Sequence, residues 1–232
     1  MYRSSVSRQH VMVLVPAFQE GPRIAAVVDG ARRHLPVVVV DDGSTDDTAA
    51  QAEAAGATVL RQVPNAGKGA ALRAGFAHAL DHGADAVVTL DGDGQHDPNE
   101  IPALLAARER SGAQLVIGRR DFRAMPVVRR VSNTVGRMVI SVAVGRDIPD
   151  NQSGYRLIGR RLMTELLDSR ESGFEFEVEM IARCVALGQP LDWVGIRTIY
   201  AGEPSHIRPW GHFASFLRVA RKARRIVNSA GA

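Results

Sequence analysis

The chain has 232 residues, of which 45% are hydrophobic and 23% charged, so it can bury the core of one full domain, with or without an appended arm. Its single cysteine, Cys184, excludes an intramolecular disulfide framework and lies in an apolar-periodic stretch that indicates a buried thiol rather than a nucleophile. The net charge of +4 is modest and aromatic residues make up only 5%, which argues against nucleic-acid binding, and no run reaches the roughly 18 apolar residues of a membrane span.

Strand and helix patterns alternate along the first half of the chain. The expected strands are Val11 to Val15, Val37 to Asp41, Ala57 to Leu60, a strand that begins at Ala86, and Gln114 to Gly118. The expected helices are Gly21 to His34, Asp46 to Ala55, Lys68 to His82 and Pro98 to Arg110. This alternation predicts a largely parallel sheet with helices on both faces, and ligands of such sheets lie beyond the carboxyl ends of the strands.

Polar clusters follow the first three strands. They are P-A-F-Q-E at 16–20, D-D-G-S-T-D-D-T at 41–48 and N-A-G-K-G at 65–69. Asp41 and Asp42 can accept hydrogen bonds from a ribose or a base, while Ser44 or Asp46 can cap the next helix. Lys68 stands in a glycine turn at a helix start, where charge and backbone N–H groups can meet a diphosphate. Neither a Walker loop nor a G-x-G-x-x-G is present, which argues against a dinucleotide oxidoreductase.

An acidic stretch, D-G-D-G-Q at 91–95, ends the strand that begins at Ala86. In extended backbone Asp91 and Asp93 point the same way, and Gln95 adds a neutral oxygen two residues further on. Mg²⁺ and Mn²⁺ prefer oxygen ligands and complete their shells with water and substrate phosphates, so a nucleoside diphosphate is the expected guest. The structural alternative is an Asp/Gly-rich surface turn between a strand and a helix.

In this order and spacing, the four motifs resemble glycosyltransferase family two and, within it, the polyprenyl-phosphate glycosyltransferases of the dolichol-phosphate mannosyltransferase type. The resemblance implies an α/β GT-A fold over residues 1–208, with a mixed, mostly parallel sheet flanked by helices, followed by a C-terminal amphipathic helix over residues 209–232. It implies that Asp91, Asp93 and Gln95 hold the divalent metal that bridges the donor diphosphate. The residues that it implicates in nucleoside binding are Pro16, Ala17, Glu20, Asp41 and Asp42.

The second half of the chain departs from this alternation. The apolar segment from Met125 to Val144 resembles the family's acceptor helix, in which a basic residue and a serine meet the acceptor phosphate; Arg129 and Ser132 match this pattern, and the alternative is a core helix with snorkelling arginines. Three further segments resemble motifs of the family. D-N-Q-S-G-Y-R at 150–156 resembles its D-x-x-S-G-F-R, and F-E-F-E-V-E at 174–179 resembles its F-E-x-E helix. The segment 199–209 resembles its loop, from which Ser205, His206 and Arg208 would reach the diphosphate or the acceptor.

The chemistry of a phosphate acceptor explains why many arginines and no obvious base are expected. A phosphate monoester, with a second pKa of about 6, is already largely anionic at neutral pH and needs guidance rather than deprotonation. Bidentate guidance could come from Arg119, Arg129, Arg130 and Arg208. If the acceptor is instead a soluble or glycan alcohol, Glu177 or Glu179 becomes the candidate base; the structural alternative is that these are solvent-facing charges on an amphipathic helix.

The predicted function is a metal-dependent inverting transfer of a hexose, of mannose or glucose type, from a GDP- or UDP-linked sugar to a polyprenyl phosphate. Mg²⁺ or Mn²⁺ would act as a Lewis acid on the departing nucleoside diphosphate. Alternatives are a sugar-phosphate nucleotidyltransferase, which would share the sheet and the metal site, and a non-catalytic nucleotide-binding module.

The C-terminal arm has the pattern of a basic amphipathic helix. From Phe213 apolar residues share one face, and the other face carries Arg218, Arg221, Lys222 and Arg225. Such a helix can lie at the interface of an anionic membrane, so we expect a cytoplasmic protein that contacts the inner face of the cell membrane peripherally. The alternative is a packing helix that covers the sheet, with ordinary solvated cations.

Overall fold

The computed structural model describes residues 10–121, 127–197, 199 and 211–229, with the backbone alone at 127–129, 131–132 and 211–216. The strands of the described residues form one seven-stranded sheet in the order β3-β2-β1-β4-β6-β5-β7. They are β1 (Val11–Ala17), β2 (Val37–Asp41), β3 (Thr58–Arg61), β4 (Ala86–Thr89), β5 (Leu115–Arg120), β6 (Arg156–Gly159) and β7 (Leu191–Ile196). Only β6 runs antiparallel to its neighbours, β4 and β5, so the predicted mixed, mostly parallel sheet is confirmed for this part of the chain.

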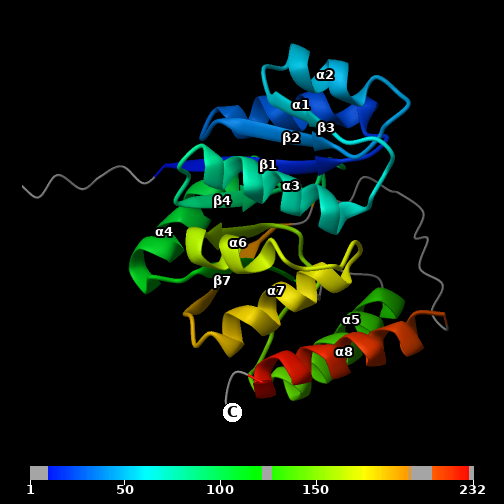
Figure 1. Cartoon of the computed structure of the whole chain (residues 1–232), viewed down its shortest axis with the longest axis vertical. Helices are drawn as coiled ribbons and strands as arrows, with labels where there is room; N and C mark the ends of the chain where they lie inside the picture. The colour runs from blue at the N-terminus through cyan, green and yellow to red at the C-terminus, as the bar shows by residue number, and fades with distance from the viewer. Residues whose placement is uncertain (1–9, 122–126, 198, 200–210, 230–232) are drawn as a thin grey trace, which may run out of the picture.

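Helices cover both faces of the sheet (Figure 1). They are α1 (Gly21–Arg32), α2 (Thr48–Ala54), α3 (Lys68–Asp81), the 3₁₀ helix η1 (Pro98–Glu100), α4 (Ile101–Ser111), α5 (Val127–Val144), α6 (Arg160–Leu166), α7 (Glu175–Ala186) and α8 (Gly211–Ser229). The predicted helices agree with these apart from their ends, except that Pro98 to Arg110 divides into η1 and α4. Strands β6 and β7 and helix α6 were not predicted.

Two cores lie on opposite faces of the sheet. Along β1, Met12 and Leu14 belong to the core under α3, α6 and α7, while Val13 and Val15 belong to the core under α1 and α4. A strand buried on both faces is continuously apolar rather than alternating, and this is why V-M-V-L-V is apolar throughout. Because β1, β2 and β4 are parallel and adjacent, their carboxyl ends meet at one edge of the sheet, with Ala17 in register with Asp41.

Helix α8 packs against α7 and α5 at the end of the sheet beyond β7 (Figure 1). Val219, Ala220 and Ala223 are buried in the core that also contains residues of α5 and α7. The predicted basic face is present: Arg218, Arg221 and Arg225 are exposed, and Lys222, whose side chain is 42% exposed, lines the same surface hollow. Lys222 differs from the three arginines in that its ammonium binds Glu171 and Glu179. The helix therefore packs on other helices through an apolar face and keeps a basic outer face. Within the described part of the chain, every helix is too short or too polar to cross a bilayer.

The expected burial of Cys184 is confirmed. Its side chain has no exposed surface in helix α7, and its sulfur lies 3.7 Å from the carbonyl oxygen of Gln189. Burial raises the pKa of the thiol to about 12. We therefore expect Ellman's reagent to leave the native protein almost unmodified at about pH 8, because roughly one thiol in ten thousand is then ionised and reagent access is blocked.

The control for this prediction is the same protein in guanidinium chloride, in which one thiol per chain should react at once. Rapid labelling of the native protein, at a rate close to that of the unfolded chain, would contradict the buried placement of Cys184.

Candidate functional site

The candidate site lies at the edge of the sheet where β1, β2 and β4 end. An ion-paired cluster occupies it: the Lys68 ammonium lies 2.7 Å from Asp91 Oδ1 and 2.8 Å from Glu177 Oε1. The imidazole Nε2 of His96 lies 3.3 Å from the other oxygen of Asp91. Lys68 opens α3, Asp91 follows β4, and Glu177 lies in the first turn of α7. Three segments far apart in the sequence therefore meet at one ammonium group.

The ionisation of this cluster follows from burial and charge. Burial opposes the charge of Lys68, but the carboxylates of Asp91 and Glu177 outweigh it and raise the pKa of Lys68 above its ordinary value. Burial would likewise raise the pKa of Asp91, but Lys68 and His96 hold it well below the usual range. The result is a lysine and a carboxylate that are both charged at neutral pH.

Asp93 is in a different electrostatic position from Asp91. Its Oδ1 accepts a hydrogen bond from the backbone N–H of Gln95 at 2.9 Å. Burial raises the pKa of Asp93, and the nearby charge of Asp91 adds to the increase. A carboxylate in this position is one that a bound cation would stabilise.

The donor atoms of this stretch fit a divalent metal. Among the described residues no group of three or more His, Cys, Asp or Glu side chains is arranged to hold an ion. The predicted set of Asp91, Asp93 and Gln95 has only two carboxylates and an amide oxygen. A set of this kind suits Mg²⁺ or Mn²⁺, which take oxygen ligands and keep positions for water and phosphate.

The turn that presents Lys68 is held in place by hydrogen bonds to Asp42. The Asp42 carboxylate accepts hydrogen bonds from the backbone N–H groups of Ala66 at 2.8 Å and Gly67 at 2.7 Å. Gly67 has φ +93°, and a Cβ atom there would lie 2.6 Å from the carbonyl oxygen of Ser172, so the position needs glycine. Asp42 thus has a structural task in addition to the nucleoside contact predicted for it.

The loop after β1 is tied to the loop after β2. Gln19 has φ +58° and donates its backbone N–H to Ser44 Oγ and its side-chain amide to Thr45 Oγ1. This left-handed conformation is uncommon for a non-glycine residue, and the two hydrogen bonds hold Gln19 in it. Asp46, rather than Ser44, accepts the N–H at the start of α2.

The other predicted nucleoside contacts lie at the same edge. Pro16 and Ala17 end β1, Glu20 pairs with Arg23, and Asp41 accepts the N–H of Ser44 at 3.1 Å. The structure therefore brings together the residues predicted for the donor, which are Pro16, Ala17, Glu20, Asp41, Asp42, Lys68, Asp91, Asp93 and Gln95.

The segment D-N-Q-S-G-Y-R at 150–156, which leads into β6, lies against Asp91. A Cβ atom on Gly154 would lie 2.5 Å from Asp91 Oδ2, so glycine leaves the space that this carboxylate fills. Arg156 is fully buried and donates to the carbonyl oxygens of Ser153, Asn151 and Glu177. Sequence reasoning missed this role of Arg156. The available signal was an arginine that directly precedes the apolar run L-I-G.

The predicted acceptor residues are only partly described. Arg119 is exposed at the end of β5 and Arg130 is exposed on α5. Arg129 and Ser132 lie in the helical backbone of α5, and their side chains, like all of Ser205, His206 and Arg208, lie outside the described residues. Arg120 makes a bidentate ion pair with Asp150, at 2.8 and 2.9 Å, so this guanidinium is already engaged.

Neither candidate base is a solvent-facing charge. Glu177 is buried and paired with Lys68, and Glu179 is buried between Arg183 and Lys222. Burial would raise the pKa of Glu179, but these two cations lower it. A carboxylate held ionised by two cations is a poor acceptor for a proton, so Glu179 is ill suited to act as a base.

Both the sequence and the fold of this chain are similar to those of known proteins. The sequence profile of the family described as "Glycosyl transferase family 2" matches residues 12–167. An undecaprenyl-phosphate mannosyltransferase from Micrococcus luteus is 31% identical over 77% of this chain and 79% of its own length. A polyprenol monophosphomannose synthase from Mycolicibacterium smegmatis is 31% identical over 78% of this chain and 74% of its own.

The fold has a solved counterpart. Glucosyl-3-phosphoglycerate synthase from Mycobacterium tuberculosis, in a crystal structure with Mg²⁺ and UDP, aligns with a TM-score of 0.71 and 23% identity, over 96% of this chain and 79% of that one. This likeness confirms the predicted GT-A type of fold.

The shared ammonium of Lys68 generates the first prediction for the site. Lys68→Met should lower the free energy of unfolding by about 1 to 3 kcal/mol at neutral pH, less than for a fully enclosed pair because the side chain keeps 35% of its surface exposed. In Lys68→Met the ammonium no longer lowers the pKa of Asp91, so burial raises this pKa. The loss should therefore be larger at about pH 8 than at about pH 4.5, where the carboxyl is closer to its protonated form.

Urea unfolding of both proteins at the two pH values measures this difference, and Lys68→Arg, which keeps the charge, is the matched control. A loss of stability that is equal at both pH values would mean that the ammonium does not hold the Asp91 carboxylate ionised.

Proposed function

The chain belongs to glycosyl transferase family 2, and on that premise we propose that it moves a hexose from a nucleoside-diphosphate sugar to a polyprenyl phosphate, with inversion at the anomeric carbon. The observation that carries the proposal is the convergence of Asp91, Asp93 and the charged Lys68 where the strands end. In an open α/β sheet this edge is where a nucleotide binds, and the charges match a diphosphate and its cation.

On the donor side, Lys68 faces the diphosphate from the N-terminus of α3, where its charge and the helix dipole favour an anion. The backbone N–H groups of Ala66, Gly67 and Gly69 in this turn are already bonded to Asp42 and Ser172. Asp91, Asp93 and Gln95 would hold Mg²⁺ or Mn²⁺, which when bound offsets the charge that develops on the departing nucleoside diphosphate. Asp41, Asp42 and Glu20 lie where the nucleoside would sit. The donor is GDP- or UDP-linked, with a sugar of mannose or glucose type.

On the acceptor side, a phosphate oxygen attacks the anomeric carbon while the bond from that carbon to the nucleoside diphosphate breaks, and the bonding pair leaves with the diphosphate. No proton has to be removed, because the phosphate is already anionic. This agrees with the ion pairs that already hold Glu177 and Glu179. Arg119 and Arg130 would orient the phosphate, together with Arg129, Ser132 and Arg208 as the family resemblance implies.

A surface made by α5 and α8 suits a membrane-borne acceptor. Val135, Met138 and Val142 share one face of α5 and are 46%, 59% and 77% exposed. The adjacent helix α8 exposes Arg218, Arg221 and Arg225. An exposed apolar stripe beside a cationic helix fits an anionic bilayer surface. We place the protein at the inner face of the cell membrane, in peripheral contact, and the relatives named for polyprenyl phosphates support this acceptor.

Asp93→Asn tests the metal and the reaction together. The exchange removes a charge from the ion's ligands without changing the size of the side chain, so turnover should fall by at least about a hundredfold and Mn²⁺-dependent binding of GDP or UDP should weaken in calorimetry. The reaction of the wild-type protein with a short polyprenyl phosphate should release nucleoside diphosphate and no pyrophosphate.

Asp147→Asn, which changes an exposed carboxylate elsewhere, is the control and should leave both measurements unchanged. Full activity of Asp93→Asn in the presence of a chelator would remove the metal assignment. Release of pyrophosphate would indicate a nucleotidyltransferase. Preference for an alcohol acceptor would contradict the proposal that the acceptor is a lipid phosphate.

The membrane surface is tested with vesicles that contain anionic phospholipid. Changing Arg218, Arg221 and Arg225 to Glu should abolish sedimentation of the protein with these vesicles, because each cation near the surface contributes about 1 kcal/mol. Wild-type sedimentation should fall in high salt, which screens the attraction.

The matched control carries the same charge change elsewhere, at the exposed residues Arg160, Arg161 and Arg170. Equal loss of sedimentation in both triple variants would mean that net charge, rather than α8, causes the effect. Sedimentation with the vesicles that does not change between low and high salt would exclude electrostatic docking.

A further inference from the structure

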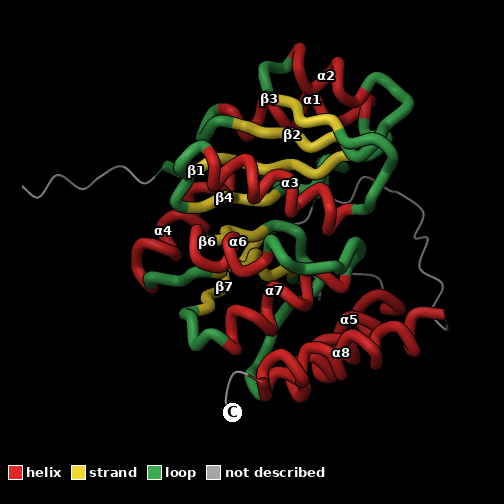
Figure 2. The backbone as a smooth tube through the Cα atoms, in the orientation of Figure 1, coloured by secondary structure: helices red, strands yellow, loops and turns green. Residues whose placement is uncertain are grey.

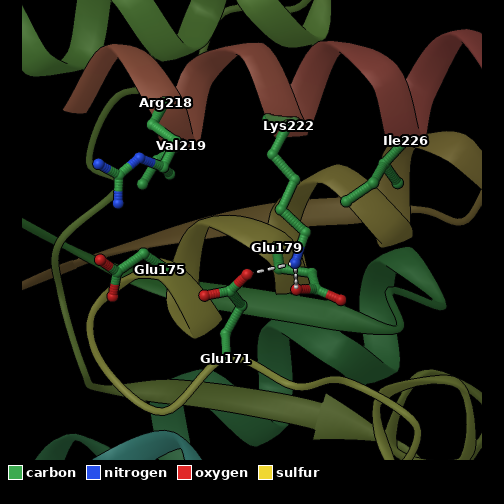
Figure 3. Close-up of a pocket in the computed structure, with 8 residues that line it drawn as sticks. Glu171, Glu175, Glu179, Arg218, Val219, Lys222 and Ile226 are labelled. Carbon is green, nitrogen blue, oxygen red and sulfur yellow. Dashed lines mark hydrogen bonds and ion pairs between the residues drawn. The ribbon is translucent and has the colours of Figure 1, made fainter. Parts of the chain in front are cut away.

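Lys222 is a partly exposed cation of α8 whose ammonium binds carboxylates of the protein. Its ammonium contacts Glu171 Oε1 and lies 2.7 Å from Glu179 Oε2, as Figure 3 shows. Glu179 is almost fully buried on α7, whereas Glu171 belongs to the loop that precedes α7. Lys222 thus joins the C-terminal helix to two neighbouring segments at once.

The loop that carries Glu171 is in direct backbone contact with the turn that presents Lys68. The carbonyl oxygen of Ser172 accepts the N–H of Gly69 at 2.7 Å, and that of Glu171 accepts a hydrogen bond from the Arg73 guanidinium. A Cβ atom on Gly69 would lie 2.5 Å from the carbonyl oxygen of Glu171. Figure 2 shows this loop beside the start of α3. The loop that carries Glu171 therefore cannot move unless the turn at 67–69 moves with it.

A second contact fixes the same segment from the other side. Glu177, six residues after Glu171, binds the Lys68 ammonium, and its carbonyl oxygen accepts a hydrogen bond from Arg156. The segment 171–179 is therefore held between two lysines, Lys222 on α8 and Lys68 at the donor site. Loss of Lys222 would release Glu171 from α8 and leave Arg183 of α7 as the remaining cation bound to Glu179.

We propose that Lys222 is a positioning residue for the donor site: by binding Glu171 and Glu179 it holds the segment 171–179, and through it the turn at 67–69 and Lys68. The inference rests on the proposed function only in that this turn meets the donor diphosphate. It links α8, whose outer face carries the exposed arginines, to the affinity for the nucleotide.

Lys222→Met in the full chain tests this role by two measurements. Hydrogen exchange of peptides that cover residues 64–74 should become faster, because the bond from the Gly69 N–H to Ser172 is loosened. The dissociation constant for GDP or UDP with Mn²⁺, and the KM for the donor, should rise about threefold to tenfold, with kcat at saturating donor little changed, as expected for a partly exposed ion pair that acts through one loop.

Controls separate positioning from simple stabilisation. Arg224→Met removes an exposed cation two positions away on α8 and should change neither measurement. Lys222→Arg should restore both, and Glu171→Gln combined with Lys222→Met should add little to Lys222→Met alone, because the two residues act as one unit.

Unchanged exchange at 64–74 in Lys222→Met would overturn the inference, and so would a general loss of stability that raises exchange throughout the protein and is not rescued by arginine. If the wild-type protein bound no nucleoside diphosphate, the proposed function would fail, while the exchange of this turn would still decide whether Lys222 positions it.

Discussion

The site depends on one ammonium group between two carboxylates. Lys68 stands where the end of β4 and the first turn of α7 would otherwise bring Asp91 and Glu177 together without a cation, and like charges in a partly buried place repel strongly. The lysine can take this position because Asp42 binds the two backbone N–H groups just before it and because Gly67 tolerates a left-handed conformation. The charge balance and the backbone geometry of the turn therefore depend on each other.

The parallel half of the sheet was predictable because its strands are buried on both faces. A continuous apolar run such as Val37 to Val40 fits a strand that is buried on both faces of a sheet. In a parallel sheet the carboxyl ends of such strands share one edge. That topology places Asp91 and the turn that carries Lys68 at the same edge of the sheet. The burial of Cys184 was predictable from helical spacing, because its apolar neighbours repeat along one face of a helix.

Besides β6, β7 and α6, the features that the sequence did not reveal are the partners of charged side chains. Arg156 begins β6 with its guanidinium satisfied by three backbone carbonyl groups, and Arg120 is neutralised by Asp150, thirty residues away. The two carboxylates that bind Lys222 were missed as well, because periodicity reports polarity and not partners. Pairing of distant charges is a property of the tertiary structure, so a sequence pattern can show that a lysine is present but not which carboxylate it will meet.

These buried pairs also bear on the chemistry. An enzyme that deprotonates an alcohol needs a carboxylate or an imidazole whose proton affinity is free to act, and such groups are usually raised in pKa. Here Asp91 and Glu179 are shifted the other way by neighbouring cations, and Glu177 is bound to Lys68. Asp93 is the exception, because burial raises its pKa, and its proposed task is to bind the cation. A site built in this manner stabilises negative charge on its ligands and carboxylates rather than accepting protons. It is therefore better matched to an acceptor that arrives already ionised, and a phosphate is the simplest acceptor of that kind.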